Sequence, residues 1–356
     1  MEFIAQYGLF LAQAVTIVVA LLVVLTAIVS LGHRQKGQPD GHIEIRHIND
    51  RYKDMADVIR QHVIDKNTFK LEQKAARKAA KQKSKADKKA ARSADKKGQG
   101  SQACPSKPRL FTLSFDGDMN AGATENLREE ISAVLSQTKE GDAILLKLES
   151  PGGLVHSYGL AASQLQRIKD AGVPLTIAVD KVAASGGYMM ACLADRILAA
   201  PFAVIGSIGV LAQIPNFHRL LKKHDIDYEL LTAGEYKRTM TMFGENTDKA
   251  REKFSQDLEL THELFKSFVK EARPSLDIDK VATGEVWYGR NALQEGLVDE
   301  IGTSDAFIQQ RLADWEIYEV RYLQKKQWQE KLGMAAESTL ERSIQKLWQR
   351  SRSPLV

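Results

Sequence analysis

A turn of small residues between an apolar segment and a helix-like segment is the stretch of this sequence best suited to chemistry. The apolar run Leu175–Val179 predicts a strand, and residues 180–192 follow it as DKVAASGGYMMAC. Ser185 lies in the turn, and a strand that turns sharply into a helix exposes the residue at the turn. The first N–H groups of that helix have no hydrogen-bond partner within the helix, and they point towards a group bound at the serine. Ser185 is therefore a candidate nucleophile, although Gly-x-Ser-x-Gly is absent and a Gly-rich turn without chemistry is the alternative.

A second glycine turn, Ser150-Pro151-Gly152-Gly153, follows the apolar segment 143–148, which predicts another strand. Glycine lets a substrate carbonyl approach bare backbone, because no Cβ stands in the way. One N–H from Gly152 or Gly153, together with one from Gly186, would form an oxyanion hole. The two turns together have compositions suited to acyl transfer.

A serine hydroxyl needs a partner that takes its proton, and this sequence offers histidine or lysine. His156 follows the Gly-Gly turn and is the one histidine expected near Ser185, whereas the others fall on predicted helices among charged residues: His218, His224 and His262. Lys237 falls in a predicted loop between Gly234 and Thr239. A lysine free in water has a pKa of about 10.4, so a lysine base needs desolvation that lowers the pKa by roughly 2.5–3 units.

Ser207 lies in a charge-free segment and is a candidate for holding a lysine amine. Its hydroxyl would keep the lone pair of the amine aimed at Ser185. Without further information Lys237 is better explained as a solvated surface lysine, because the chain contains many lysines. The residues by themselves leave His156, Lys237 and a turn without chemistry as open alternatives.

Strand-like and helix-like segments alternate around these candidates and predict an α/β domain with a mostly parallel sheet. Strands are expected at 110–115, 143–148, Leu175–Val179, Arg196–Ala199 and 228–232, and helices at 123–138, 155–169, 216–224 and 248–273. The segment 197–217 also lacks charge, but prolines and glycines interrupt it repeatedly. We expect buried strands and turns there rather than a membrane span.

The N-terminal segment 1–40 is predicted to be a transmembrane anchor, because residues 7–31 contain no charged side chain and are long enough to cross a bilayer. Glu2 precedes the apolar run and no basic residue does, which favours a retained anchor over a cleaved signal peptide. Arg34 and Lys36 follow the run, and flanking positive charge favours a cytoplasmic location for the rest of the chain.

Three further parts follow the anchor: a basic helical extension at 41–107, the α/β domain at 108–305 and a basic amphipathic tail at 306–356. The Lys-rich run 70–97 lacks aromatic residues for base stacking, so a solvated linker or lipid-surface segment is favoured and no nucleic-acid partner is expected. The tail is equally compatible with a membrane surface, a partner or solvent. Two cysteines, Cys104 and Cys192, make no disulfide scaffold, and Cys192 is expected to be buried in an apolar helix.

Several ordered motifs between residues 110 and 302 resemble the SppA/SohB family of membrane-bound Ser–Lys peptidases, and the anchor and charged extension are most similar to its SohB branch. The motifs are Ser150-Pro151-Gly152-Gly153, Ala184-Ser185-Gly186-Gly187-Tyr188, Gly206-Ser207-Ile208-Gly209, Glu235-Tyr236-Lys237, Gly289-Arg290-Asn291-Ala292 and Gly296-Leu297-Val298-Asp299. Each motif is weak alone, whereas their common order and spacing are specific.

The resemblance implies that Ser185 is the nucleophile, Lys237 the general base, Ser207 the residue that orients the lysine, and Gly152 and Gly186 the oxyanion donors. It also implies a ClpP/crotonase-like spiral fold, no cofactor and no metal, a homo-oligomeric ring in which neighbouring subunits complete the site, and peptide substrates that are apolar or signal-peptide-like. The family's location is the bacterial inner membrane with a periplasmic domain, whereas the charges after the anchor favour the cytoplasm.

Two other functions fit parts of the sequence. A crotonase-type acyl-CoA enzyme would share the scaffold and the Gly-rich oxyanion turns, but it has no role for a Ser–Lys pair. An inactive membrane scaffold or lipid-binding adaptor would instead work through the basic linker and the tail.

Overall fold

The computed structural model describes residues 41–65 and 107–324, together with isolated positions at 16, 67–68, 71, 74–75, 78, 81–82 and 85. The chain divides into two compact units, residues 43–322 and residues 1–42 with 323–356. The predicted anchor at 1–40, apart from position 16, and the tail beyond 324 lie outside the described residues.

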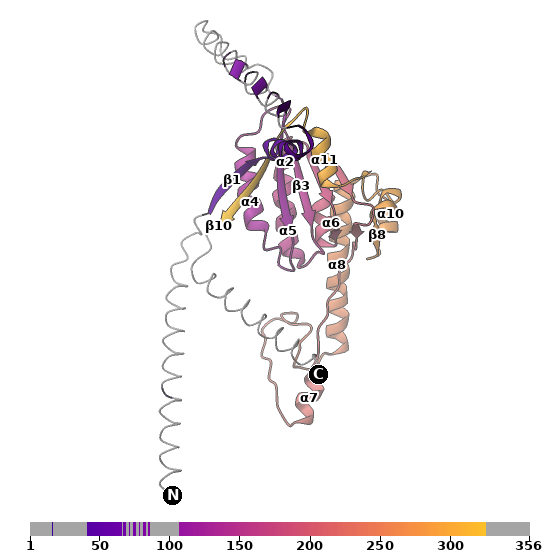
Figure 1. Ribbon diagram of the computed structural model, residues 1–356. Helices are drawn as coiled ribbons and strands as arrows, with labels where there is room; N and C mark the ends of the chain where they lie inside the picture. Colours follow the sequence, from indigo (N-terminus) through magenta and orange to yellow (C-terminus); the bar gives the residue numbers. More distant parts are fainter. Residues whose placement is uncertain are drawn as a thin grey trace, which may run out of the picture. The chain divides into compact units, whose positions relative to one another are not determined.

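The framework of the unit is a seven-stranded sheet with the order β1-β10-β2-β3-β4-β6-β9 (Figure 1). Neighbouring strands from β10 to β9 all run parallel. The strands are β1 (Gly41–His47), β2 (Arg109–Asp116), β3 (Ala143–Glu149), β4 (Leu175–Val179), β6 (Arg196–Ala199), β9 (Glu300–Ile301) and β10 (Glu316–Gln324). The predicted α/β class with a mostly parallel sheet is confirmed.

A smaller sheet, β5-β7-β8, carries the turn with Ser185. Its strands are β5 (Val182–Ala184), β7 (Val204–Gly206) and β8 (Val286–Tyr288), of which β5 and β7 are parallel and β8 is antiparallel to β7. A bridge between Ser150 and Ala183 connects the end of β3 to β5. The two predicted glycine turns therefore lie side by side, although about 35 residues separate them along the chain.

Helices cover both faces of the large sheet, because alternate residues of its buried strands are apolar on each side. Phe111, Leu113 and Ile144 belong to the core on the side of α4 (Thr124–Leu135), α5 (Val155–Asp170) and α6 (Gly186–Ala191). Leu110 and Leu145, one position out of phase, pack on the other side with residues of α2 (Ile48–Val63) and α11 (Ser304–Arg311). The remaining helices are α7 (His218–Lys223), α8 (Asp248–Ala272), α9 (Ile278–Val281) and α10 (Gly289–Gln294).

The compact unit extends beyond the predicted limits of 108–305 at both ends. β10 pairs with β2 in the register Ile317 to Leu110, and β1 pairs with β10 at the edge of the sheet. The extension predicted at 41–107 therefore begins with a strand of the main sheet. Neither β1 nor β10 stands out in the sequence, because charged side chains interrupt the apolar positions of both.

The first part of the segment 197–217 contains most of β6 and all of β7, as predicted, whereas residues 211–217 are exposed and not buried as expected. Among the residues that the structure describes, no helix combines the length and the apolar character needed to cross a membrane.

The strand predicted at 228–232 is wrong: these residues are irregular and exposed. They belong to an arm, residues 211–247, that contains α7 and leads into α8 (Figure 1). The arm closes on itself, since the Asn216 amide donates to the Thr241 and Gly244 carbonyls and the Phe217 N–H donates to the Met242 carbonyl. An apolar run becomes a strand only where a neighbouring strand takes up its backbone hydrogen bonds, and the arm provides none.

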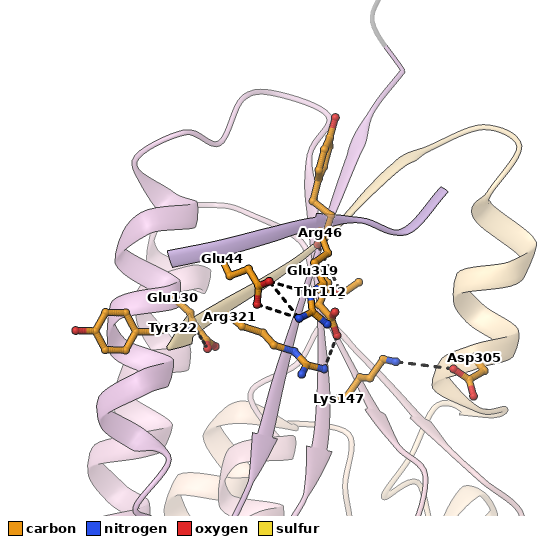
Figure 2. Close-up of polar contacts among 10 residues, drawn as sticks. Glu44, Arg46, Thr112, Glu130, Lys147, Asp305, Glu319, Arg321 and Tyr322 are labelled. Atoms are coloured by element: carbon orange, nitrogen blue, oxygen red, sulfur yellow. Dashed lines mark hydrogen bonds and ion pairs between the residues drawn. The ribbon is translucent and has the colours of Figure 1, made fainter. Parts of the chain in front are cut away.

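Glu130 is a buried carboxylate on α4 beside the end of β10 (Figure 2). Its Oε1 accepts the Tyr322 N–H at 2.8 Å, whereas its Oε2 has no hydrogen-bond partner among the described residues. Burial raises the pKa of Glu130 to about 7, and this outweighs the opposing effects of the Tyr322 hydrogen bond and the Arg321 charge. The folded protein therefore holds a proton here that the unfolded chain releases at a lower pH.

We expect Glu130→Gln to stabilise the protein at pH 8 and to have little effect near pH 4.5. The folded state binds the extra proton between the two pKa values, so the stability of the wild type falls as pH rises from about 4.5 to 7, by about 3 kcal/mol in total. Glutamine keeps the acceptor for Tyr322 and removes the charge. Urea unfolding at both pH values measures the difference, with the exposed neighbour Glu129→Gln as control. Equal effects of the two variants at pH 8 would contradict the burial argument.

Candidate active site

Ser185 lies between β5 and α6 with a backbone φ of 52° and ψ of −117°. A non-glycine residue in this region costs about 1–3 kcal/mol, and such residues cluster at active sites. The Ser185 N–H donates to the Gly206 carbonyl at 2.8 Å, which holds the turn to β7. The Ser185 side chain does not cap α6, so its hydroxyl is not used by the helix. The predicted strand-to-helix turn is confirmed as a strained elbow, in which Ser185 is half-buried rather than fully exposed.

The Ser150-Pro151-Gly152-Gly153 loop lies against this elbow. A Cβ at Gly152 would be 2.7 Å from the Ser185 Cβ and 2.8 Å from the Gly186 nitrogen, so only glycine fits. The positive φ of Gly152, +89°, also favours glycine at this position. The Ser150 N–H donates to the Val182 carbonyl and the Ser150 carbonyl accepts the Ala184 N–H, which fixes the loop to β5.

The hydrogen bonds distinguish the candidate oxyanion donors from one another. The Gly152 N–H donates to the Ser150 Oγ at 3.1 Å and is therefore occupied. The N–H groups of Gly153 and Gly186 have no acceptor among the described residues, and both glycines line the pocket next to Ser185. The structure thus brings Gly152 and Gly186 together as predicted, but Gly153 presents the unused N–H of the loop.

Ser207 is a neighbour of Ser185 through the register of the small sheet. Ala184 pairs with Gly206 in the parallel pair β5–β7, and the two serines follow directly at the carboxyl ends of these strands. Ser207 also has a positive φ of 53°, and its N–H donates to the Glu285 carbonyl. The sequence indicated a serine in a core segment, whereas the strand pairing brings it next to the nucleophile.

Lys237 is in the arm and is exposed. The neighbouring Glu235 pairs with Lys249, and the Tyr236 ring lies 5.7 Å from the Lys253 ammonium, so this loop lies against the first turns of α8. The pocket beside Ser185 contains Thr261 and Phe265 of the same helix, twelve residues further on. At 1.5 Å per residue the two places are about 18 Å apart along α8, well beyond hydrogen-bond reach. Within one chain the described structure does not bring Lys237 to Ser185.

None of the four candidate histidines is hydrogen-bonded to Ser185 in the described part of the chain. His156 is exposed at the start of α5 and has no hydrogen bond to Ser185 among the described residues. His262 on α8 has Nε2 at 3.2 Å from the Ile208 carbonyl, a backbone contact. His218 lies on α7 and His224 at its end, both within the arm.

A small, mostly apolar pocket adjoins Ser185. Its lining combines the two glycine turns with side chains from three helices and one loop: Gly153, Val155, Ser185, Gly186, Met189, Gly209, Val210, Thr261 and Phe265. Phe265 and Thr261 come from α8, where the helical periodicity indicated only a core stripe. The lining is mostly apolar, which is the composition of sites that receive apolar groups.

Tyr158 is a residue of this site that the sequence pattern did not indicate. It is fully buried on α5, and its hydroxyl lies 2.6 Å from the Ser150 Oγ and donates to the Asp118 carbonyl at 2.8 Å. A tyrosine on the apolar face of a predicted helix carries no signal beyond core packing.

The other chemical groups near the elbow are inert. Cys192 is buried in the short turn after α6, as predicted, and burial raises the pKa of its thiol to about 12. Within the described part of the chain, no three His, Cys, Asp or Glu side chains are grouped so that they could hold a metal ion.

Comparisons with known proteins agree on one family. The model for the N-terminal part of peptidase family S49 matches residues 2–165, and the model for peptidase family S49 matches residues 167–316. The chain is 51% identical over 338 residues to "Probable protease SohB" of Haemophilus influenzae, covering 95% of this chain and 94% of the relative. A "Probable protease SohB" of Buchnera aphidicola subsp. Schlechtendalia chinensis is 47% identical over 308 residues, covering 86% of this chain and 99% of the relative.

Solved structures are similar at a much lower level. Among them is a mutant of a 1510-N membrane-bound stomatin-specific protease in complex with a substrate peptide, with 14% identity and a TM-score of 0.40. The match covers 64% of this chain and 96% of that one, and it is too weak to support a conclusion about the site. The two S49 models, which match in order along the chain, and relatives about half identical over most of it show that this chain belongs to peptidase family S49.

Proposed function

We propose that this chain is a membrane-anchored serine endopeptidase in which Ser185 is the nucleophile. The observation that carries the proposal is the elbow: a strained serine at a helix N-terminus, with two unused N–H groups beside it and an apolar pocket next to it. These are the parts that acyl transfer from a peptide carbonyl requires.

In the proposed reaction the Ser185 Oγ attacks the scissile carbonyl carbon while a base takes the hydroxyl proton. The carbonyl oxygen becomes negatively charged in the tetrahedral intermediate and accepts hydrogen bonds from the Gly186 N–H and the Gly153 N–H. The C–N bond then breaks, the leaving amine takes the proton, and an ester to Ser185 remains. Water attacks this acyl-enzyme in the same site, releases the second product and restores the Ser185 hydroxyl.

Lys237 is the proposed base, and a neighbouring copy of the chain is the proposed source of that lysine. Two observations support this assignment. The arm holds its own lysine about 18 Å from the pocket along α8, as estimated from the helical rise. It also exposes large apolar side chains, among them Leu211, Leu230 and Leu231, which a homo-oligomeric ring would cover. Ser207 would receive the incoming amine beside Ser185.

The substrates we propose are peptides with small apolar side chains, including signal-peptide-like segments, because the pocket lining is apolar apart from Ser185 and Thr261. The two sheets, one nearly all parallel, support a ClpP/crotonase-like spiral as the fold. The uncharged residues 7–31 support a single-pass anchor in a bacterial inner membrane.

Labelling with a fluorophosphonate probe tests the proposed nucleophile. We expect the detergent-solubilised full chain to be labelled once, at Ser185, and to hydrolyse a fluorogenic peptide with a small apolar residue at the cleavage site. Absence of both labelling and hydrolysis in the oligomeric wild type would refute the proposed function. Labelling at another serine would refute the assignment of the site.

A further inference from the structure

Tyr158 contacts both halves of the proposed oxyanion hole. Its ring packs directly against the elbow, since a Cβ at Gly186 would be 2.4 Å from the Tyr158 Cγ. Its hydroxyl lies on the other side of the site, 2.6 Å from the Ser150 Oγ in the glycine loop. Ser150 and Tyr158 are both fully buried, so no exchange with solvent competes with this contact.

The protons in this network have a single possible order. The Asp118 carbonyl can only accept a hydrogen bond, so the Tyr158 hydroxyl donates its one proton to it, at 2.8 Å. The Ser150 hydroxyl must then donate to the Tyr158 oxygen, and the free lone pairs of Ser150 accept the Gly152 N–H at 3.1 Å. Burial raises the pKa of Tyr158 above its usual value, so the phenol stays protonated. The chain of bonds from Gly152 to Asp118 is complete, and every hydroxyl in it is satisfied.

The network fixes the peptide unit that carries the unused N–H. On one side of Gly153 the Gly152 N–H is held by Ser150, and on the other side the Leu154 N–H donates to the Met119 carbonyl at 2.9 Å. A Cβ at Gly153 would be 2.2 Å from that same Met119 oxygen, so the loop lies directly on the turn after β2. The segment 152–154 is thus held at both ends by neighbouring carbonyls. The Asp118 carbonyl holds Gly152 through Tyr158 and Ser150, and the Met119 carbonyl holds Leu154 directly.

We infer that Tyr158 and Ser150 are positioning residues that fix the direction of the Gly153 N–H towards the reacting carbonyl oxygen, a role that rests on the proposed peptidase function. Neither side chain touches the substrate in this assignment. They act through Gly152, and the ring of Tyr158 sets the distance between the loop and Gly186. An oxyanion donor is effective only if it already points to where the charge develops.

Tyr158→Phe removes the hydroxyl and keeps the ring, and Tyr188→Phe is its matched control. Tyr188 is also fully buried, and its hydroxyl also donates to a backbone carbonyl, that of Leu297 at 2.9 Å, but the hydroxyl makes no hydrogen bond to the glycine loop among the described residues. Loss of one oxyanion donor typically lowers kcat about 10²–10³-fold, and a displaced donor should cost less. We expect Tyr158→Phe to lower kcat ten- to a hundredfold with KM changed less than threefold, and Tyr188→Phe to change either by less than threefold.

A peptide aldehyde gives a second measurement, because its adduct with Ser185 carries the same oxygen. We expect its inhibition constant to rise in Tyr158→Phe by about the factor by which kcat falls. Thermal unfolding of both tyrosine variants measures how much the loss of each buried hydroxyl destabilises the fold. Equal kcat values in the two variants, or a rise in KM that accounts for the whole loss in Tyr158→Phe, would overturn the positioning role.

Ser150→Ala keeps the inference testable if Tyr158→Phe fails to fold. Because both residues act through one network, kcat of the variant with both Ser150→Ala and Tyr158→Phe should be at most threefold lower than kcat of the slower single variant. A kcat loss equal to the product of the two single losses would overturn the inference. If the wild type is active and Tyr158→Phe and Tyr188→Phe have equal kcat values, this inference is refuted and the proposed function is not. An unlabelled and inactive wild type, or a fully active Ser185→Ala, refutes the proposed function itself.

Discussion

Ser185→Ala is expected to lower the rate of peptide hydrolysis by at least about 10⁴-fold, because the proposed acyl-enzyme forms on the hydroxyl that the substitution removes. Alanine retains the Cβ, so the backbone at φ 52° is no more strained than with serine. The hydroxyl makes no hydrogen bond to α6, so its loss leaves the helix start unchanged. Initial rates with a fluorogenic peptide and the thermal unfolding curve of the same preparation measure both parts of the prediction.

Ser163→Ala is the matched control for this variant. Ser163 is exposed on α5, and its hydroxyl donates to the Gly159 carbonyl within the same helix. We expect wild-type rates from it. Hydrolysis by Ser185→Ala within tenfold of the wild type would rule out Ser185 as the nucleophile.

Lys237→Ala is expected to reduce hydrolysis to the same degree as Ser185→Ala, because a nucleophile and its base act as a unit. The variant with both substitutions should be no slower than either single variant. Lys237 is exposed on the arm, so its removal should leave the thermal unfolding temperature unchanged. Lys223→Ala, an exposed lysine of α7 on the same arm, should retain wild-type activity. A Lys237→Ala protein with wild-type activity would leave the proposed dyad without its base.

Mixed oligomers test where the lysine comes from. If each site takes Ser185 from one copy and Lys237 from its neighbour, co-assembled Ser185→Ala and Lys237→Ala chains contain some sites in which both groups are native. We expect the two inactive variants to regain a substantial fraction of wild-type activity when they are unfolded and refolded together. Absence of recovery in verified mixed oligomers would mean that the dyad forms within one chain and that the arm changes position to form it.

Local sequence patterns predicted most of the elements that position the site. The run Leu175–Val179 forms β4, the expected strand at 143–148 lies within β3, and the long amphipathic helix at 248–273 matches α8 within one residue. These predictions depend on side-chain periodicity over a few neighbouring residues, which the sequence contains in full. The strands β1 and β10 were missed, since their partners are distant in the chain and their charged residues obscure the alternation.

The sequence alone determined that Ser185 follows a strand at a small-residue turn and that a glycine pair ends the strand beside it. It could not determine which hydrogen bonds these backbones make. Only the tertiary structure decided that the Gly152 N–H is taken by Ser150, that Gly153 presents the unused donor, and that Tyr158 touches both turns. It also decided that Ser207 lies beside Ser185 and that Lys237 does not. The physical reason is that these relations join residues far apart in the chain, and they depend on strand register and packing, which no local pattern encodes.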